Sequence, residues 1–435
     1  MSKQISKRNI NKKQKKFSKV KNLKKNKKTN GIIGAIIVAF SLGIMIYHFN
    51  QTYIYSNNIA KNIFIENIDV SQMTKEEAIE VVTKNQSPKN IYLSYEDKKY
   101  EILPKDIDLK YNVEEVVEEA YNYTKTDKYF ENVKRYFSLK DNKKNIEIKP
   151  SYDEAKLSED IQKISNDINI DMVNAKVYIS NSGSISTSQS TTGKELDIAS
   201  TKESIINTIK NKEYNEIQLK ANIKNPHIKT QDAKSVNTLL AQFTTKFSTN
   251  ASNRTYNIKN AANKSSNVLL MPGEEFSYNN LTGVRNKANG YKDAPVIING
   301  KLEDALGGGV CQVSTTLYNS VLSSGLQLTS RTNHSLVSSY VPLGRDAMVN
   351  DVGTDFRFKN PYSHPIYIKN IVGNGTVTSR IYGNSTDKKN IDIKVDTFKE
   401  NGLDAARTYR LYKDSNQNVI KKEYIDKSVY KKAKK

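Results

Sequence analysis

An uncharged stretch of nineteen residues, Gly31–Phe49, sets the strongest constraint on how this chain folds. A helix rising about 1.5 Å per residue needs about 20 apolar residues to cross a membrane core of ~30 Å, so the stretch is long enough for one crossing. The thirty residues before it hold thirteen Lys or Arg and no Asp or Glu, and such positive flanks stay in the cytoplasm. The sequence predicts a single-pass cell-membrane protein with a cytoplasmic tail, residues 1–30, and an extracytoplasmic bulk at the cell wall.

A cleaved signal peptide is the competing interpretation of this stretch. Signal peptides have a shorter apolar core, about 7–15 residues, followed by small residues at the cleavage site. Here His48, Phe49, Asn50 and Gln51 follow the apolar run instead. The pattern therefore favours an uncleaved transmembrane helix at residues 31–49.

The charge distribution argues against a nucleic-acid partner. The formal net charge is +22, of which the tail carries thirteen units, leaving +9 from Gly31 onward, and six of those nine lie after Glu400. Phosphate recognition needs a concentrated basic footprint, which the nearly balanced central region lacks. The single cysteine excludes an intramolecular disulfide. With no CxxC, HExxH, GxGxxG or P-loop pattern, no metal or cofactor is expected.

The sequence of the exported region predicts an α+β fold that is divided into three consecutive parts. Residues 54–229 alternate short strand-like runs with amphipathic helices, and we expect a mixed α/β wall-facing domain there. Residues 237–388 contain the cysteine and clustered glycines, and we expect an α+β domain of a helix packed on antiparallel strands. Residues 389–435 add strands near Tyr409–Tyr412 and Asn418–Tyr424, which we expect to complete that sheet, and a basic tail.

Several local patterns in the wall-facing part predict individual elements. Capping boxes are expected where a hydroxyl or amide precedes a Glu by three residues, at Thr74 and Asn112. The remaining predictions are a strand at Ile63–Val70, a hairpin at Ile91–Leu103, a loop at Ser180–Thr192 and a strand at Tyr214–Ile223.

Three segments of this part share one pattern, in which an apolar–Asp–apolar run precedes a helix start. They begin at Ile68, Ile107 and Leu196. A degenerate internal repeat and the ordinary grammar of a strand followed by a helix both explain it. No active-site residue set occurs in this part, which favours a binding or spacing role.

The segment GGGVCQVSTTLYNSVLSSG, from Gly307, carries the strongest chemical signal. Val313, Leu317 and Val321 recur at helical spacing, and Gly325 can end the helix, so we expect a helix at Gln312–Ser324. Cys311 then lies in its first turn, where unpaired N–H groups and the helix dipole stabilise a thiolate. Burial of Cys311 beneath a tight glycine turn is the structural alternative.

A thiolate nucleophile needs a proton acceptor and a group that orients it. His334, at the start of a strand-like run, is the preferred candidate, and His364, in a turn beside Pro365, is the lesser one. Asp346 is the expected orienting carboxylate, with Asn333 and Asp351 behind it.

The remaining candidates would contact a substrate. The planar fork of Arg345 suits a substrate carboxylate. Glycine side chains let a substrate approach the sulfur closely, and the expected contacts beside Arg345 are Gly309, Gln312 and Tyr340.

Five ordered motifs together resemble the VanW domain family. They are MPGEEFSYNNLTG from Met271, GGGVCQVSTTLYN from Gly307, NHSLVSSYVPLGRDAMV from Asn333, TDFRFKNPYSHPIYI from Thr354 and GLDAARTYRLYKD from Gly402. The resemblance covers about Asn237–Asp414. The part before it is similar to the peptidoglycan-binding region that often precedes such domains.

The resemblance implies a function in the cell wall. Some clostridial members of the family are linked to L,D-transpeptidation, which joins peptidoglycan stem peptides by 3–3 cross-links through a cysteine acyl-enzyme. Cys311 matches the family cysteine and His334 falls in its histidine motif, while the N–H groups of Cys311 and Gln312 are the expected oxyanion donors. The HxxG and SxGC motifs of the well-known L,D-transpeptidases are missing, so the activity would belong to a separate fold.

Two other functions stay open at this point. A cysteine carboxypeptidase or endopeptidase of the wall would share the acyl-enzyme and let water resolve it. A non-enzymatic peptidoglycan-binding protein would not need the thiol. In all three cases the partners are peptidoglycan and the membrane.

Overall fold

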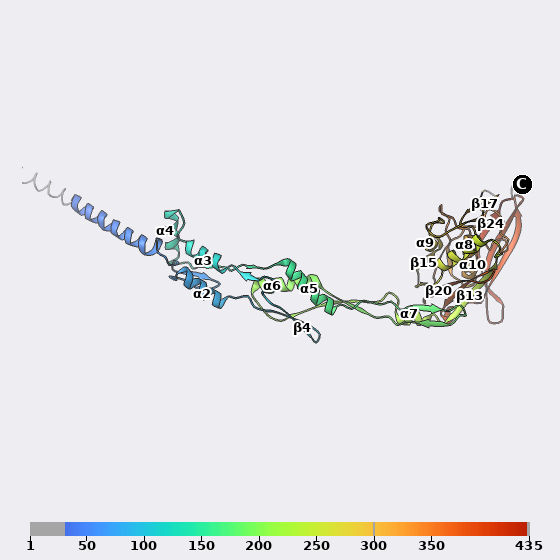
Figure 1. The fold of residues 1–435 in the computed structure, drawn as a ribbon, viewed down its shortest axis with the longest axis horizontal. Helices are drawn as coiled ribbons and strands as arrows, with labels where there is room; N and C mark the ends of the chain where they lie inside the picture. The colour runs from blue at the N-terminus through green and yellow to red at the C-terminus, as the bar shows by residue number, and fades with distance from the viewer. Residues whose placement is uncertain (1–30, 299–300, 433–435) are drawn as a thin grey trace, which may run out of the picture. The chain divides into compact units, whose positions relative to one another are not determined.

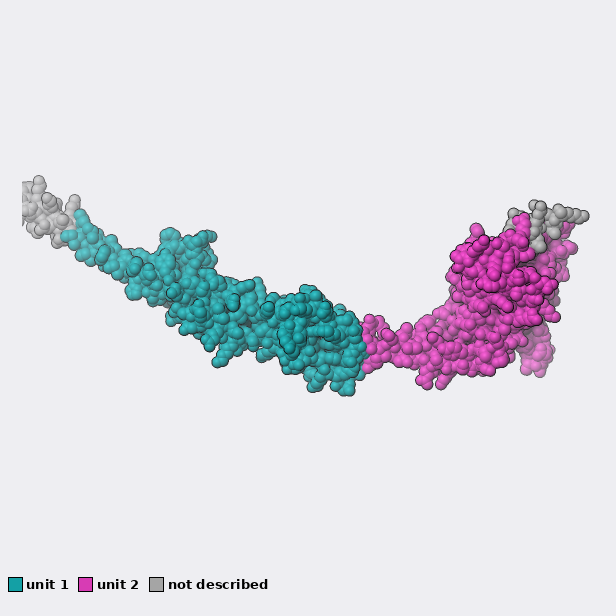
Figure 2. Space-filling model, in the orientation of Figure 1, with its two compact units in different colours: residues 1–168, 196–221 teal, residues 169–195, 222–435 magenta. Residues whose placement is uncertain are grey.

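The computed structural model describes residues 31–298 and 301–432, which form two compact units of mixed α and β structure (Figures 1 and 2). The first unit comprises Met1–Ile168 and Leu196–Ala221, and the second comprises Asn169–Glu195 and Asn222–Lys435. The expected basic tail, residues 1–30, lies outside the described residues. The mixed α+β class agrees with the sequence prediction.

The apolar stretch forms a helix that continues into the first unit. The helix covers Gly31–Ile54, and its length and apolar composition suit one membrane crossing. Its last five residues, Asn50–Ile54, form a π-helical turn (η1). Ile54 is 1% exposed, and the ring of Phe49 stacks on that of Phe137 with centroids 5.5 Å apart. The chain therefore passes from the apolar stretch into a folded core without an intervening loop.

The first unit has two hydrophobic cores in succession. One core lies between the sheet β2-β1-β6 and three helices, and the other between the sheet β11-β3-β4 and the paired helices α5 and α6 (Figure 1). Its elements are β1 (Ile63–Ile65), β2 (Ile68–Asp69), α2 (Lys75–Asn85), β3 (Ile91–Tyr95), β4 (Lys98–Ile102), β5 (Lys110–Tyr111), α3 (Val113–Asn122), α4 (Tyr129–Ser138), β6 (Lys144–Ile146), β7 (Pro150–Ser151), α5 (Glu154–Ile168), α6 (Ile198–Asn211) and β11 (Ile217–Gln218).

Two local predictions in this unit are confirmed. At Thr74, the side chain accepts from the Glu77 N–H at 3.2 Å and the Glu77 carboxylate accepts from the Thr74 N–H at 2.9 Å. The hairpin predicted at Ile91–Leu103 forms as β3 and β4.

Other local predictions are corrected. The strand predicted at Ile63–Val70 is a hairpin, because Glu66 and Asn67 adopt positive φ angles of 49° and 62° and reverse the chain. Asn112 makes no capping bond, because its side-chain oxygen accepts from the Lys149 N–H at 2.8 Å instead.

The predicted loop at Ser180–Thr192 contains strand β9, which pairs with β8. The predicted strand at Tyr214–Ile223 is divided between β11 and β12. Each of the three segments with the shared pattern is a strand followed by a helix, β2–α2, β5–α3 and β10–α6, which fits both explanations of the pattern.

In the second unit, helix α10 lies on the four-stranded sheet β13-β21-β20-β14. Hydroxyl groups tie the helix to the sheet: Thr316 bonds Thr245 at 2.8 Å, and Ser320 donates to the Ser379 carbonyl at 2.8 Å. Almost every residue of α10 is buried, because helix α8 also packs against it. The helix begins at Val310 rather than Gln312, and Cys311 lies in its first turn as predicted.

The last strands form a separate antiparallel sheet, β22-β23-β24, so the prediction that they complete the helix-bearing sheet is wrong. Strand β23 pairs on one side with β22 and on the other with β24, which leaves it no free edge. This sheet instead closes the end of α10, since the guanidinium of Arg410 donates to the carbonyls of Leu322 and Leu326 at 2.8 and 2.7 Å.

The elements of the second unit have the following bounds, with β10 and β12 crossing from one unit to the other. They are β8 (Val177–Ile179), β9 (Ile185–Thr187), β10 (Gly193–Leu196), β12 (Ala221–Lys224), α7 (Thr230–Ser235), β13 (Thr238–Lys246), α8 (Ser252–Lys264), β14 (Val268–Leu270), β15 (Glu275–Ser277), α9 (Tyr278–Thr282), β16 (Asp293–Ile298), β17 (Lys301–Leu306), α10 (Val310–Ser323), β18 (Gln327–Ser330), β19 (Arg357–Lys359), β20 (Ile366–Val372), β21 (Thr376–Gly383), η2 (Ser385–Asp387), β22 (Ile391–Glu400), β23 (Leu403–Lys413) and β24 (Val419–Tyr430).

Candidate active site

A cavity of about 540 Å³ in the second unit contains both Cys311 and His334 in its lining. A larger hollow of about 800 Å³ lies against β8, β9 and β20, and the residues lining it include no Cys, His, Asp or Glu. Chemistry rather than size therefore selects the smaller cavity as the candidate site.

The glycines before Cys311 let other elements press against the start of α10. Gly309 has a φ of 103°, and a Cβ there would come within 2.8 Å of the Ile258 side chain and 3.1 Å of Arg254, both from α8. A Cβ on Gly308 would lie 2.6 Å from the Ala294 carbonyl of β16. Gly309 does line the cavity, but the space that its missing side chain leaves is occupied by α8 rather than open to a substrate.

Cys311, His334 and Asp346 are brought together in one chain of contacts. The Cys311 thiol donates to the Val349 carbonyl at 3.3 Å, and it shares the cavity lining with His334, whose side chain interacts with the thiol and lowers its pKa. The His334 Nδ1 lies 2.6 Å from Oδ2 of Asp346, which also accepts from the His334 backbone N–H at 2.6 Å. With Nδ1 held by the carboxylate, Nε2 is the ring nitrogen left to exchange a proton with the sulfur.

His334 itself lies in an irregular segment between β18 and β19, so the strand predicted to begin there is absent. The bonds from Asp346 to both the backbone and the ring of His334 fix this segment in place of a strand ladder.

The electrostatics of this trio favour a thiolate paired with an imidazolium. Burial raises the pKa of the Cys311 thiol, but the hydrogen bond and charge of His334 outweigh it, and the pKa falls below its ordinary value. Burial lowers the pKa of His334, but the bonds to Asp346 and Cys311 raise it overall to about 9. Asp346 is likewise desolvated, yet His334 and Arg331 hold its pKa below the usual value. The negative charge therefore resides on sulfur and carboxylate, with the proton between them.

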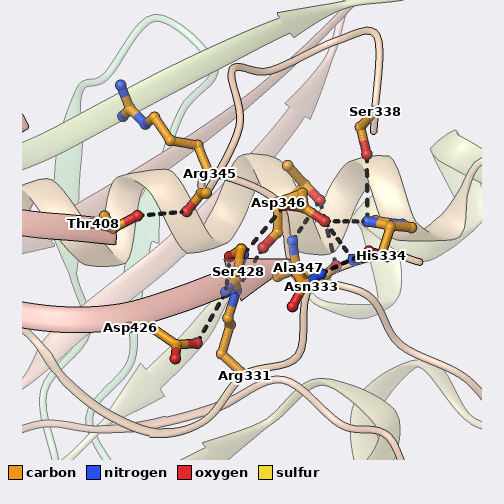
Figure 3. Close-up of polar contacts among 12 residues, drawn as sticks. Arg331, Asn333, His334, Ser338, Arg345, Asp346, Ala347, Thr408, Asp426 and Ser428 are labelled. Atoms are coloured by element: carbon orange, nitrogen blue, oxygen red, sulfur yellow. Dashed lines mark hydrogen bonds and ion pairs between the residues drawn. The ribbon is translucent and has the colours of Figure 1, made fainter. Parts of the chain in front are cut away.

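Two residues that sequence reasoning did not find, Arg331 and Tyr430, bind Asp346 from behind. Figure 3 shows the position of Arg331. The Arg331 guanidinium donates to Oδ1 of Asp346 at 3.2 Å and to its backbone carbonyl at 2.7 Å. The Tyr430 hydroxyl, from β24, donates to the same Oδ1 at 2.6 Å. Arg331 and Asp346 are 3% and 1% exposed. The carboxylate thus accepts bonds from two sides, which fixes its direction toward His334.

Of the predicted substrate contacts, Gln312 and Tyr340 line the cavity and Arg345 does not. The Gln312 amide is largely engaged in packing: it donates to Thr245 Oγ1 and the Lys246 carbonyl, both at 2.9 Å. Arg345 donates to Asn319 at 2.6 Å and lies over the Phe243 ring, and its guanidinium points away from His334 (Figure 3). A carboxylate-binding role for Arg345 in this cavity does not fit its position.

Of the two backbone N–H groups expected to bind the oxyanion, those of Cys311 and Gln312, one already has an acceptor. The Gln312 N–H donates to the Gly309 carbonyl at 3.1 Å, which leaves it less available. The Cys311 N–H has no acceptor among the described residues and remains the backbone donor closest in sequence to the sulfur.

The lesser candidates from the sequence, His364, Asn333 and Asp351, bind partners other than Cys311. His364 lies 3.0 Å from Asp387 and outside the cavity lining. The Asn333 amide anchors the His334 segment to β24 through the Val429 carbonyl at 3.0 Å. Asp351 lines the cavity, where it accepts from Arg285 at 2.8 Å.

Comparison with known proteins gives matches to two parts of the chain. Residues 253–382 match the family described as "VanW like protein", and residues 100–218 match the family described as "Putative peptidoglycan binding domain". The chain is 43% identical over 143 residues to the uncharacterized protein YoaR of Bacillus subtilis, covering 33% of this chain and 45% of that protein. It is 33% identical over 113 residues to the vancomycin B-type resistance protein VanW of Enterococcus faecalis, covering 25% of this chain and 41% of that protein.

No solved structure matches the chain. The chain spans less than half the length of the two curated relatives. The trio Cys311, His334 and Asp346 lies inside the matched region, whereas Tyr430 lies beyond it. The chain thus resembles a VanW-like protein over residues 253–382, and over residues 100–218 it resembles the family described as "Putative peptidoglycan binding domain".

Proposed function

We propose that this protein is a cysteine acyltransferase that cross-links peptidoglycan stem peptides by L,D-transpeptidation. The observation that carries the proposal is that Cys311 and His334 lie in the wall of one cavity and that the buried carboxylate of Asp346 binds His334 from behind. A nucleophile bonded to a base that is itself oriented by a carboxylate is the arrangement that acyl transfer requires. The peptidoglycan-binding domain at residues 100–218 supports the choice of substrate.

The first half-reaction forms a thioester. The Cys311 thiolate attacks the carbonyl carbon between the third and fourth residues of a donor stem, and the Cys311 N–H donates to the developing oxyanion. The protonated His334 then gives its proton to the leaving nitrogen as the carbon–nitrogen bond breaks, and D-alanine departs. Asp346 stabilises the imidazolium throughout and stays ionised.

The second half-reaction transfers the acyl group. An amine of the acceptor stem attacks the thioester carbonyl, and the neutral His334 takes the amine proton through Nε2. The carbon–sulfur bond breaks, which restores the thiolate–imidazolium pair and leaves a 3–3 cross-link. Water in place of the amine would give hydrolysis, so the resolving nucleophile decides between a transferase and a carboxypeptidase.

The test is mass spectrometry of the full chain in detergent after incubation with a disaccharide tetrapeptide. We expect an adduct on Cys311 equal to the donor minus D-alanine, together with 3–3 linked dimers. An adduct accompanied only by tripeptide products would make the protein a hydrolase. Neither adduct nor product, from folded protein, would favour a non-enzymatic binding role.

A further inference from the structure

The charges around the active-site cavity do not balance. Cys311 and His334 form one pair of opposite charges. Arg285 and Asp351, also in the lining, form a second pair at 2.8 Å. Arg254 is the remaining charged residue of the lining. Behind the lining, the Asp346 carboxylate is paired with Arg331 and His334. Among the residues that line the cavity, Arg254 is therefore the one charged side chain without an oppositely charged partner in direct contact.

Arg254 lacks a carboxylate partner in the part of the chain that the structure describes. It makes one side-chain hydrogen bond there, from Nη2 to the Gln312 Oε1 at 2.7 Å, and a neutral amide cannot neutralise a guanidinium. Residues 1–30, 299–300 and 433–435, which are not described, contain no Asp or Glu. Burial lowers the pKa of Arg254, which reflects the cost of keeping an unpaired cation out of water.

Arg254 is placed beside the nucleophile by the packing of the two helices. It lies in the first turn of α8, its acceptor Gln312 directly follows Cys311, and Gly309 lets its side chain pass at a distance that a Cβ would obstruct. Because Gln312 uses only Nη2, other N–H groups of the fork remain to bind an anion. A carboxylate matches the planar fork with two parallel bonds.

A peptide supplies such a carboxylate close to the reacting carbon when it ends one residue after the scissile bond. Consecutive Cα atoms are about 3.8 Å apart, so the terminal carboxylate of a single leaving residue stays within one residue length of the carbonyl under attack. A longer stem would place its carboxylate farther away and an uncharged peptide bond at Arg254.

We propose that Arg254 binds the free α-carboxylate of the leaving residue and thereby selects donor stems that end one residue beyond the scissile bond. This inference rests on the proposed acyl transfer and names its donor class. It also assigns to Arg254 the role that the sequence suggested for Arg345.

The first experiment does not require peptidoglycan activity. Iodoacetate and iodoacetamide are alkylating agents of similar size, and only iodoacetate carries a carboxylate next to the reacting carbon. We expect Arg254→Gln to lower the ratio of the Cys311 alkylation rates, iodoacetate over iodoacetamide, by about 10-fold or more. The matched control is Arg380→Gln, because Arg380 also bonds only neutral acceptors but lies outside the cavity lining. An unchanged ratio in Arg254→Gln overturns the proposal.

The second experiment compares a tetrapeptide donor with its C-terminal carboxamide in acylation of the full chain. We expect the wild type to prefer the carboxylate by about 10- to 100-fold and Arg254→Gln to lose the preference. A wild type that acylates with both donors equally overturns the carboxylate assignment while acyl transfer stands. A wild type that acylates with neither, although its alkylation ratio depends on Arg254, overturns acyl transfer while the anion site stands.

Discussion

The two units differ in how deeply they bury their ion pairs. In the first unit, most pairs lie at the surface, as Lys98–Asp167 does with side chains 45% and 54% exposed, and even Lys212–Glu66 keeps 16% and 21% of its side chains exposed. In the second, Arg331 and Asp346 are almost fully buried and are joined to His334 and Tyr430. Exposed pairs are screened by water and contribute little, whereas buried pairs are costly to separate and shift pKa values. The contrast accords with the proposed function, in which the first unit serves binding or spacing and the second carries the chemistry.

The largest effect is expected from Cys311→Ala. Removal of the sulfur abolishes adduct formation and 3–3 dimers, because no other thiol exists in the chain. Sedimentation with purified peptidoglycan should be unchanged, since the first unit is untouched. Loss of sedimentation together with activity would break the division of roles between the units.

Asp346→Asn should reduce the acylation rate by about 10³–10⁴-fold, because an amide holds the imidazole in the wrong tautomer and does not stabilise its charge. In the same variant, the pKa of His334 should fall below its value of about 9, which NMR titration of the imidazole ring measures. A rate loss with an unchanged His334 titration would assign Asp346 to folding alone.

Arg331→Ala should lower the free energy of unfolding of the second unit by about 3–5 kcal/mol, because it removes one of the two cationic partners of the buried Asp346 and leaves His334 as the other. Chemical denaturation followed by tyrosine fluorescence measures the change. Arg380→Ala is the matched control, because Arg380 is half-buried on β21 and bonds only neutral acceptors, and it should leave the transition in place. Equal stability of the two variants would contradict the account of Asp346.

The pH dependence should follow the thiolate–imidazolium pair. Because the pKa of Cys311 is lowered and that of His334 is raised to about 9, iodoacetamide alkylation should stay fast at neutral pH. His334→Ala removes the imidazole whose hydrogen bonding and charge lower the pKa of Cys311. It should therefore slow alkylation at pH 7 by about 10-fold or more.

The contribution of His334 to the free energy of unfolding should also depend on pH. It is fully present below the unfolded pKa of about 6.5 and is lost as the pH rises through about 9. A stability that increases across that interval would contradict this sign.

The smallest effect is expected at the surface of the first unit. Lys98→Ala breaks the pair with Asp167, and the thermal unfolding midpoint of that unit should not move measurably, because the pair is exposed. A shift as large as that of Arg331→Ala would remove the contrast between the two units.

The sequence predicted the parts of the site that lie near a local signal. Cys311 follows a glycine run at a helix start, and His334 and Asp346 lie in one short segment, so their types and spacing were informative. Arg254 and Tyr430 come from α8 and β24, far away in the chain, and neither has a motif that marks it. The direction in which a side chain points also cannot be predicted from its neighbours in the sequence. Arg345 precedes Asp346, but its guanidinium lies over the Phe243 ring instead of in the cavity.

The same limit applies to the fold. Helices with clear apolar spacing, such as α10, were predicted within two residues. Of the three strands from Ile391 onward, the two predicted segments correspond to β23 and β24, whereas β22 was missed. The two predicted strands were also assigned to the wrong sheet, because alternation defines a strand and not its partner.

Helix α10 is buried along almost its whole length, and this has a consequence for how the protein unfolds. A helix with so little exposed surface cannot loosen by fraying sideways, so its hydrogen-bonded amide protons should exchange with solvent only when the whole unit opens. The nucleophile is then part of the most persistent element of its domain. Gradual heating should therefore leave the thiol reactive in its native manner until the unit melts, with no intermediate temperature at which the protein is folded and inactive.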